Sequence, residues 1–261
     1  MTMQETGYFQ SNPAGGNEDI PVDVIPSFGT NLVDVYSVIP MSDPGNGAIG
    51  RVPSSAPVGP AVGIETPATA GGMAIYYAGR TFHTFPSPFP WNATGWTTDT
   101  DVWFVGVNPV PAASEVTIPH TLGGTPDFVL ANGLRGSMQQ GTDWAVSEIS
   151  ATQFKVRNWD AVNQITVVLA AWRVHSLQTP SETANLGFVV LNGAAPVAVP
   201  HGLGRIPDFI SVFPYETLGV QPAGLPIMDA PPDADNIYLR NVAGGLLNAM
   251  VYCQATHSIQ L

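Results

Sequence analysis

A stretch of fourteen residues occurs twice in the chain and constrains its fold more than any other feature. Residues 116–129 read VTIPHTLGGTPDFV, and residues 197–210 read VAVPHGLGRIPDFI. Two later strings repeat at a similar spacing of about 80 residues: FKVRN at 154–158 is answered by IYLRN at 237–241, and RVHSLQ at 173–178 by ATHSIQ at 255–260. A constant offset over three strings indicates one structural unit duplicated in tandem, with small loop insertions.

The composition predicts that this unit is built from strands. Gly (27) and Pro (25) are both frequent among 261 residues, which suits short strands joined by tight turns and disfavours long helices. Hydrophobic residues make up 44% of the chain, enough for a buried core, while charged residues reach only 11%. We therefore predict an all-β protein with an N-terminal extended arm followed by two tandem antiparallel β-sandwich modules.

The charge and the cysteine content exclude several classes of function. A net charge of -12 disfavours nucleic acid and anionic membrane surfaces as partners, since both attract basic residues. One cysteine, Cys253, allows neither an intrachain disulfide nor a multi-thiolate metal site. No secretory signal and no apolar run of about 18 residues is visible, which predicts a protein made in a cytoplasm and not exported by that route.

Residues 1–70 are predicted to form an extended anchoring arm. They are acidic and rich in Gly and Pro, with one strand expected at 32–39. A disordered tail is the alternative, but the segment is too apolar for a solvated tail. We expect the arm to order on a neighbouring subunit through Ile20, Val24, Phe28, Leu32 and Val35.

Residues 71–100 are predicted to be a connector with one strand at 73–78. Its aromatic, Pro-punctuated part contributes the further assembly candidates Phe85, Phe89 and Trp91. Trp91 and Trp96 leave a sugar platform open as an alternative to packing. The string RTFHTFP at 80–86 also resembles RVHSL at 173–177, which leaves open a third, degenerate module.

The two modules are predicted at residues 101–180 and 181–261. We expect strands at 102–107, 115–119, 127–131, 143–147, 153–157 and 164–174, and then at 187–191, 197–200, 208–214, 236–240 and 246–256. The nearly all-apolar run at 165–172 predicts a strand covered on both faces, or one facing another subunit. The Pro- and Gly-rich residues 213–234 are predicted to be a long loop.

The repeated turn is interpreted as a structural closure of each module. Leucine should plug the end of the sandwich, glycine should supply an unusual backbone angle, proline should direct the re-entering strand, and histidine and aspartate should bond the turn backbone. The residues assigned to these roles are His120, Leu122, Gly123, Pro126 and Asp127 in the first copy, and His201, Leu203, Gly204, Pro207 and Asp208 in the second.

The same residues support a catalytic or metal-binding interpretation only weakly. His120 with His175, His201 with His257, and the serines that follow the later histidines suggest a Ser-His-Asp site, but no Gly-x-Ser-x-Gly elbow is present. Two histidines without a third ligand make a weak metal site. Asp229, Asp233 and Asp235 could form a paired-carboxylate site, although an acidic Pro-rich loop is commonly a solvated turn. We expect no enzyme activity, no cofactor and no metal.

The turn sequence also resembles a known class of protein. The string VPHGLGRIPDF at 199–209 resembles a turn of small β modules in tailed-bacteriophage virion proteins, such as head-decoration, head-fibre, collar and tail-fibre proteins. The copy at 118–128 is similar but has Thr121 and Gly124 where Gly and Arg stand in the second. The resemblance covers about 160 residues and implies jelly-roll-like sandwiches that assemble as homotrimers. Independently, a module of about 75 residues buries only roughly 60–65% of its unfolded surface, so oligomerisation is a natural remedy.

Together these observations predict a non-enzymatic virion protein. The leading expectation is a capsid decoration or cement protein, assembled in the host cytoplasm, whose arm docks on the major capsid protein or other virion proteins. The alternative is a tail-fibre, receptor-binding or head-fibre component that contacts a host glycan.

Overall fold

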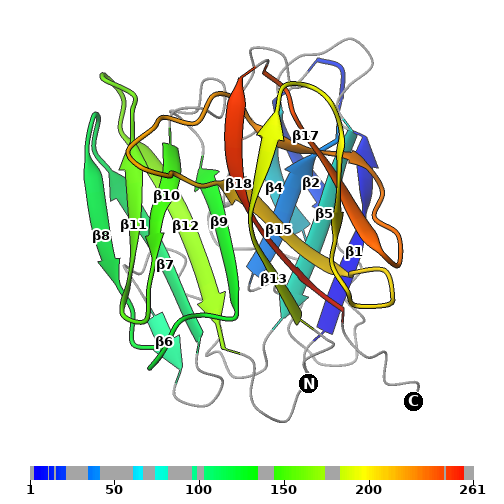
Figure 1. Cartoon of the computed structure of the whole chain (residues 1–261), viewed down its shortest axis with the longest axis horizontal. Coiled ribbons are helices and arrows are strands. Elements are labelled where there is room, and N and C mark those ends of the chain that lie inside the picture. The colour runs from blue at the N-terminus through cyan, green and yellow to red at the C-terminus, as the bar shows by residue number, and fades with distance from the viewer. Residues whose placement is uncertain are drawn as a thin grey trace.

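The computed structural model describes residues 3–10, 12–14, 16–21, 35–41, 61–66, 74–81, 96–98, 103–134, 144–173, 183–243 and 245–255. Within these ranges the chain forms antiparallel strands and no helix (Figure 1), so the all-β prediction is confirmed. No described segment is a long apolar helix of the kind that crosses a bilayer.

Six strands between residues 103 and 172 form two antiparallel sheets. One sheet has the order β7-β12-β9, and its β7 edge is extended by β6 (Trp96–Thr98); the other has the order β10-β11-β8. The bounds are β7 (Trp103–Val110), β8 (Glu115–Pro119), β9 (Phe128–Leu134), β10 (Trp144–Ile149), β11 (Gln153–Asn158) and β12 (Ile165–Trp172).

Six strands between residues 183 and 254 repeat this arrangement. Their sheets have the orders β13-β18-β15 and β14-β17-β16, which match β7-β12-β9 and β8-β11-β10 strand for strand. The bounds are β13 (Thr183–Asn192), β14 (Val197–Pro200), β15 (Phe209–Pro214), β16 (Pro226–Ala230), β17 (Asn236–Asn241) and β18 (Leu246–Gln254).

The first 81 residues contribute five further strands in two sheets. One sheet has the order β1-β5-β3, and the other pairs β2 with β4. Residues 1–70, for which an extended arm was expected, thus contain four strands whose hydrogen-bonded partners lie in the same chain. The bounds are β1 (Met3–Gln10), β2 (Gly16–Pro21), β3 (Val35–Pro40), β4 (Ala61–Thr66) and β5 (Ala74–Thr81).

The burial patterns explain why these sequences form these sheets. In β11 and β17 buried and half-buried residues alternate, as expected for strands with one face on a core and one towards water. In β12 every residue except Thr166 is buried, so both faces are covered. As predicted, residues 165–172 are covered on both faces. The covering side chains belong to the same chain, in which one apolar cluster of described residues spans all three groups of strands.

The loop predicted at residues 213–234 is wrong in part, because it contains β16. Pro226, Ile227 and Met228 are buried, and the strand pairs with β17 through a register shift between Met228 and Ala230. Only three consecutive residues of the strand are buried, with Pro222 and Gly224 before them and Pro231 and Pro232 after them. That is too short a pattern for a periodicity argument to detect.

A repeated asparagine at the end of β11 and β17 ties each pair of sheets together. The Asn158 Nδ2 group donates to the carbonyls of Val110, Pro111 and Asn163 at 2.9–3.2 Å. The equivalent Asn241 donates to the carbonyls of Ala223 and Gly245 at 2.7 and 3.0 Å. Both side chains are buried, so each amide satisfies carbonyls that water does not reach.

We expect Asn241→Ala to lower the free energy of unfolding by about 1–3 kcal/mol, because two buried carbonyls lose their donor. Chemical denaturation monitored by circular dichroism measures the change. Asn192→Ala, on the exposed end of β13, is the matched control and should change stability by less than about 0.5 kcal/mol. Equal effects of the two substitutions would contradict the role given to Asn241.

Candidate functional site

The first repeated turn is closed by both nitrogens of the His120 ring. The backbone N–H of Leu122 donates to Nδ1 at 3.4 Å, and Nε2 lies 3.1 Å from the carbonyl oxygen of Ser150. Because Nδ1 accepts, the proton of a neutral ring lies on Nε2, which donates to Ser150. The ring also packs on Phe154, with centroids 4.7 Å apart.

The second turn repeats this geometry with His201. The Leu203 N–H donates to Nδ1 at 3.2 Å, and Nε2 lies 3.1 Å from the carbonyl oxygen of Asp233. In each turn the histidine backbone N–H also bonds a carbonyl of the loop beside it, that of Thr152 or Asp235. The ring therefore fastens one loop to another in both copies, and both histidines are buried.

The other turn residues take structural positions as well. Leu122, Leu203, Pro126 and Pro207 are buried, and Gly123, Gly202 and Gly204 have φ values of 67–69°, which favour glycine. The backbone N–H groups of Asp127 and Asp208 donate to the carbonyls of Trp172 and Gln254, each at 3.0 Å, and so begin the next strand pair. The structure thus brings each set of five predicted turn residues together at one end of a sheet pair.

Burial lowers the pKa of His120 below its ordinary value of 6.5, and the hydrogen bond with the Ser150 carbonyl opposes this effect. The ring therefore resists protonation in the folded chain. A neutral, buried and fully bonded imidazole has no lone pair available for general base catalysis or for a metal.

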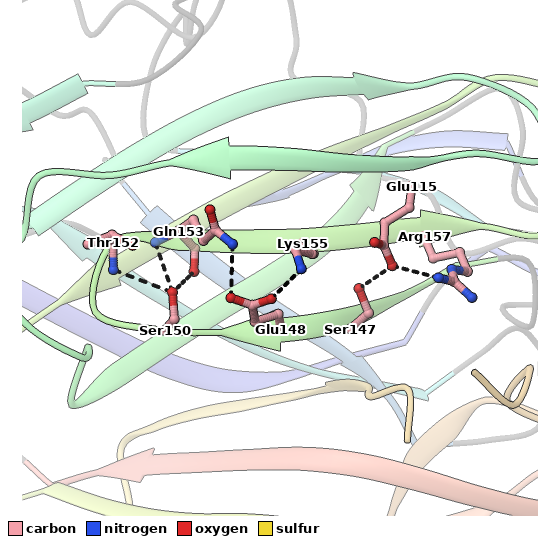
Figure 2. Close-up of polar contacts among 8 residues, drawn as sticks. All are labelled: Glu115, Ser147, Glu148, Ser150, Thr152, Gln153, Lys155 and Arg157. Carbon is pink, nitrogen blue, oxygen red and sulfur yellow. Dashed lines mark hydrogen bonds and ion pairs between the residues drawn. The ribbon is translucent and has the colours of Figure 1, made fainter. Parts of the chain in front are cut away.

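A ladder of polar side chains covers the outward face of the β10-β11-β8 sheet (Figure 2). Lys155 pairs with Glu148 at 2.6 Å, and Gln153 donates to the same carboxylate at 2.9 Å. At the other end Arg157 and Ser147 both donate to Glu115 at 2.9 Å. These contacts link the three strands across the sheet, and because they are half-exposed each adds little to stability.

Glu216 extends this ladder from a different sheet. It follows β15, and its Oε1 lies 3.2 Å from Nη1 of Arg157 on β11. Its backbone N–H donates to the carbonyl of Val146 on β10 at 2.8 Å, beside an isolated parallel bridge between Val146 and Tyr215. Glu216 therefore joins the β13–β18 group to the β7–β12 group.

Burial of the Glu216 side chain disfavours the ionised form of its carboxyl group. Its side chain is 5% exposed, against 34% for Arg157, and its Oε2 has no hydrogen-bond partner among the described residues. Burial raises the pKa of Glu216 above its ordinary value of 4.5; Arg157 opposes the shift, and the nearby Glu115 carboxylate adds to it. A raised pKa of this kind occurs in catalytic acids, but here the carboxyl is buried and paired with Arg157.

The acidic residues considered for a paired-carboxylate site are used locally. Asp229 pairs with Arg240 at 2.8 Å. The Asp233 carboxylate accepts from the N–H groups of Asp235 and Asn236 and from the Tyr238 hydroxyl, and these bonds hold its pKa below the usual range. Within the described part of the chain no three His, Cys, Asp or Glu side chains are grouped to hold a metal ion.

Several predicted residues lie outside the described residues or have undescribed side chains. Ile20 and Val35 belong to β2 and β3, but nothing is described of their side chains. The rest lie outside the described ranges: Val24, Phe28, Leu32, Phe85, Phe89 and Trp91 among the assembly candidates, and the later histidines His175 and His257.

Sequence reasoning missed the Glu216–Arg157 contact. The only available signal was that Arg157-Asn158 and Arg240-Asn241 repeat while Glu216 has no counterpart in the first copy. A single unmatched acidic residue in a repeat marks a place where two copies are joined differently, but its partner depends on how the sheets pack.

Comparison with known proteins does not identify the chain. No protein-family model matches it, and no curated protein or solved structure is significantly similar to it. The geometry of the chain and the resemblance of its repeated turn are therefore the two indications of its function.

We expect the free energy of unfolding to fall as the pH is lowered below about 6.5, because the unfolded chain takes up a proton that folded His120 resists. Replacing His120 with Gln should lower stability at neutral pH and flatten the curve in this window. Denaturant titrations between pH 5 and pH 8 measure both effects. An unchanged slope in the variant would show that another group is responsible.

We expect the opposite sign for Glu216. Since its folded pKa lies above 4.5, the folded chain keeps a proton that the unfolded chain releases, and stability falls as the pH rises past 4.5. Glu216→Gln should remove this fall. The variant should melt at a higher temperature than the unchanged chain at pH 7, and its advantage should be smaller at pH 4. Glu148→Gln is the control: the pKa of Glu148 is lowered by Lys155 and Gln153, so its removal should cost stability at the higher pH only.

Proposed function

We propose that the chain is a non-enzymatic structural protein of a tailed-bacteriophage virion. In this proposal residues 101–180 and 181–261 are tandem jelly-roll-like β-sandwich modules. The observation that carries it is that one sheet order and one histidine-closed turn recur in both halves. A turn whose ring nitrogens serve its own closure supports a structural role, and its sequence resembles turns of virion β modules.

Within the virion, capsid decoration is the role that we propose first. A decoration protein stabilises a shell by bridging subunits, with a gain of about 25 cal/mol for each Å² of apolar surface buried. Many copies on one particle add their weak contacts by avidity. The acidic chain, with a net charge of -12, suits basic patches on a major capsid protein or another virion protein.

The docking residues that we propose lie between the strands of the first 100 residues. Because β1 to β4 pair within the chain, we assign the anchoring role proposed for residues 1–70 to the segment between β2 and β3, together with the segment between β5 and β6. The segments 22–34 and 82–95 contain most of the predicted assembly candidates. The proposed location is the virion. The resemblance implies a homotrimer; a mass of one chain in solution would contradict that expectation and favour a trimer of β units within one chain.

We expect the protein to be present in purified virions of the phage that encodes it, detected by mass spectrometry. Particles made without it should bind the added protein in cosedimentation. The double variant Phe85→Ser, Phe89→Ser should bind at least tenfold more weakly, since a few aromatic anchors carry most of the energy of an interface.

The matched control is Phe188→Ser on β13, a phenylalanine that is 55% exposed and lies outside the proposed docking segments. It should bind like the unchanged chain. Absence of the protein from purified virions would overturn the virion role. Undiminished binding of the double variant would overturn only the docking segments.

A receptor-binding role is the second candidate, and one observation favours it. The turn after β15 presents Leu218, which is fully exposed, and Val220, which is 63% exposed. Exposed apolar side chains at a loop tip are a common feature of recognition surfaces. Saturable binding of the chain to a host glycan on an array, lost in Leu218→Ser, would favour this role over decoration.

A further inference from the structure

The strands of residues 3–81 follow the same order as the two later groups. β1-β5-β3 corresponds to β7-β12-β9 and to β13-β18-β15, while β2-β4 corresponds to β8-β11 and to β14-β17. All of these pairs are antiparallel. A counterpart of β10 and β16 would fall within residues 42–60, which lie outside the described residues. We call the groups β1–β5, β7–β12 and β13–β18 the first, second and third units.

Register and sequence support the correspondence. Residues 34–40 read DVYSVIP and residues 208–214 read DFISVFP, so Asp, Ser, Val and Pro occupy the same positions. Val35 is paired with Arg80 as Phe209 is paired with Gln254. One residue past each strand, the N–H of Met41 donates to Ala74 and that of Tyr215 donates to Asn248, both at 2.8 Å.

The three equivalent strands β3, β9 and β15 meet in the middle of the molecule. Each contacts the other two, and Figure 1 shows β9 beside β18 where the second and third units adjoin. Phe128 of β9 lies 5.4 Å from Phe209 of β15 and 5.6 Å from Tyr252 of β18, measured between ring centroids. Ser37, Leu130 and Ser211, which hold the same register position in the three strands, are each 1% exposed.

The contacts between units run in one rotational direction. β10 of the second unit packs on β15 of the third, and β16 of the third unit packs on β3 of the first. Both contacts join the same two kinds of strand, head to tail. Repeated head-to-tail contacts between like units produce a closed ring when the rotation brings the last unit to the first.

We infer that residues 3–81 are a third copy of the β unit and that the three copies close a pseudo-threefold ring within one chain. Each unit meets its neighbours through its β3-, β9- or β15-type strand, and the second and third units also through β10 and β16; its partners are the other two copies. The protein is thus the single-chain counterpart of a homotrimer of small sandwiches. This inference does not depend on the virion role.

Ring closure predicts a specific pair of neighbouring residues. Val146 and Tyr215 form a bridge between the second and third units. Met228 precedes the register shift of β16 as Val146 precedes that of β10, and Met41 holds the position of Tyr215. Met228 should therefore face Met41, at a separation that permits a disulfide between cysteines.

The test is cysteine cross-linking of the full chain under mild oxidation, read by non-reducing electrophoresis and mass spectrometry. The pair Val146→Cys, Tyr215→Cys is the positive control. The pair Met41→Cys, Met228→Cys should form an intrachain bond as well, whereas Met41→Cys, Val146→Cys should not, because the ring runs in one direction only. Burial raises the pKa of the native Cys253 thiol to about 12, which keeps this residue out of exchange.

The oligomeric state completes the test. Analytical ultracentrifugation should give the mass of one chain, and the melting temperature should not change over a 100-fold range of protein concentration. A threefold mass with a concentration-dependent melting temperature, or cross-links between chains for the Met41 and Met228 pair, would overturn the single-chain ring. Failure of this pair to cross-link while the positive control does would overturn the third copy.

Discussion

Burial of both faces of the central strands β12 and β18 is the constraint on which the rest of the structure depends. The sheet that contains β12 and the one that contains β18 have a second sheet on one side and neighbouring strands on the other. Each residue in these strands must therefore be apolar, small or fully hydrogen-bonded. This explains why charge is sparse in the chain and why the polar ladder of Glu148, Lys155, Glu115 and Arg157 lies on the outward-facing sheet.

The polar contacts that repeat stabilise each pair of sheets, whereas the one that does not repeat joins two groups of strands. The histidine turns and the buried asparagines Asn158 and Asn241 recur because each sheet pair has the same ends to close and the same carbonyls to satisfy. Glu216 occurs once, and it joins two groups of strands instead of closing one. Function in a repeat protein of this kind is expected where the copies differ. These places are the contacts between the groups of strands, the exposed turn at Leu218 and the segments between the strands of the first 100 residues.

Much of the second and third groups of strands could be predicted from the sequence, and the reason is local. The alternation of apolar and polar residues in β11 and β17, the apolar run in β12 and the repeated turn each predict a strand from a short window of residues. The strands β1, β2, β4 and β16 were missed because their segments are short, acidic or interrupted by Gly and Pro. The pairing of β1 with β5 and of β2 with β4 is also non-local, and no window of neighbouring residues contains it.

The sequence by itself determined the all-β class, the repeat and the chemistry of the turn, since a strand pattern states which side chains must be buried. Only the tertiary structure decided what buries them. The sequence allowed a second subunit to cover residues 165–172, whereas in the structure Trp172 meets Phe209 of the same chain, with centroids 6.0 Å apart. The physical reason is that the hydrophobic effect is not directional. An apolar run shows that a strand must be covered, but which surface covers it depends on how the whole chain folds.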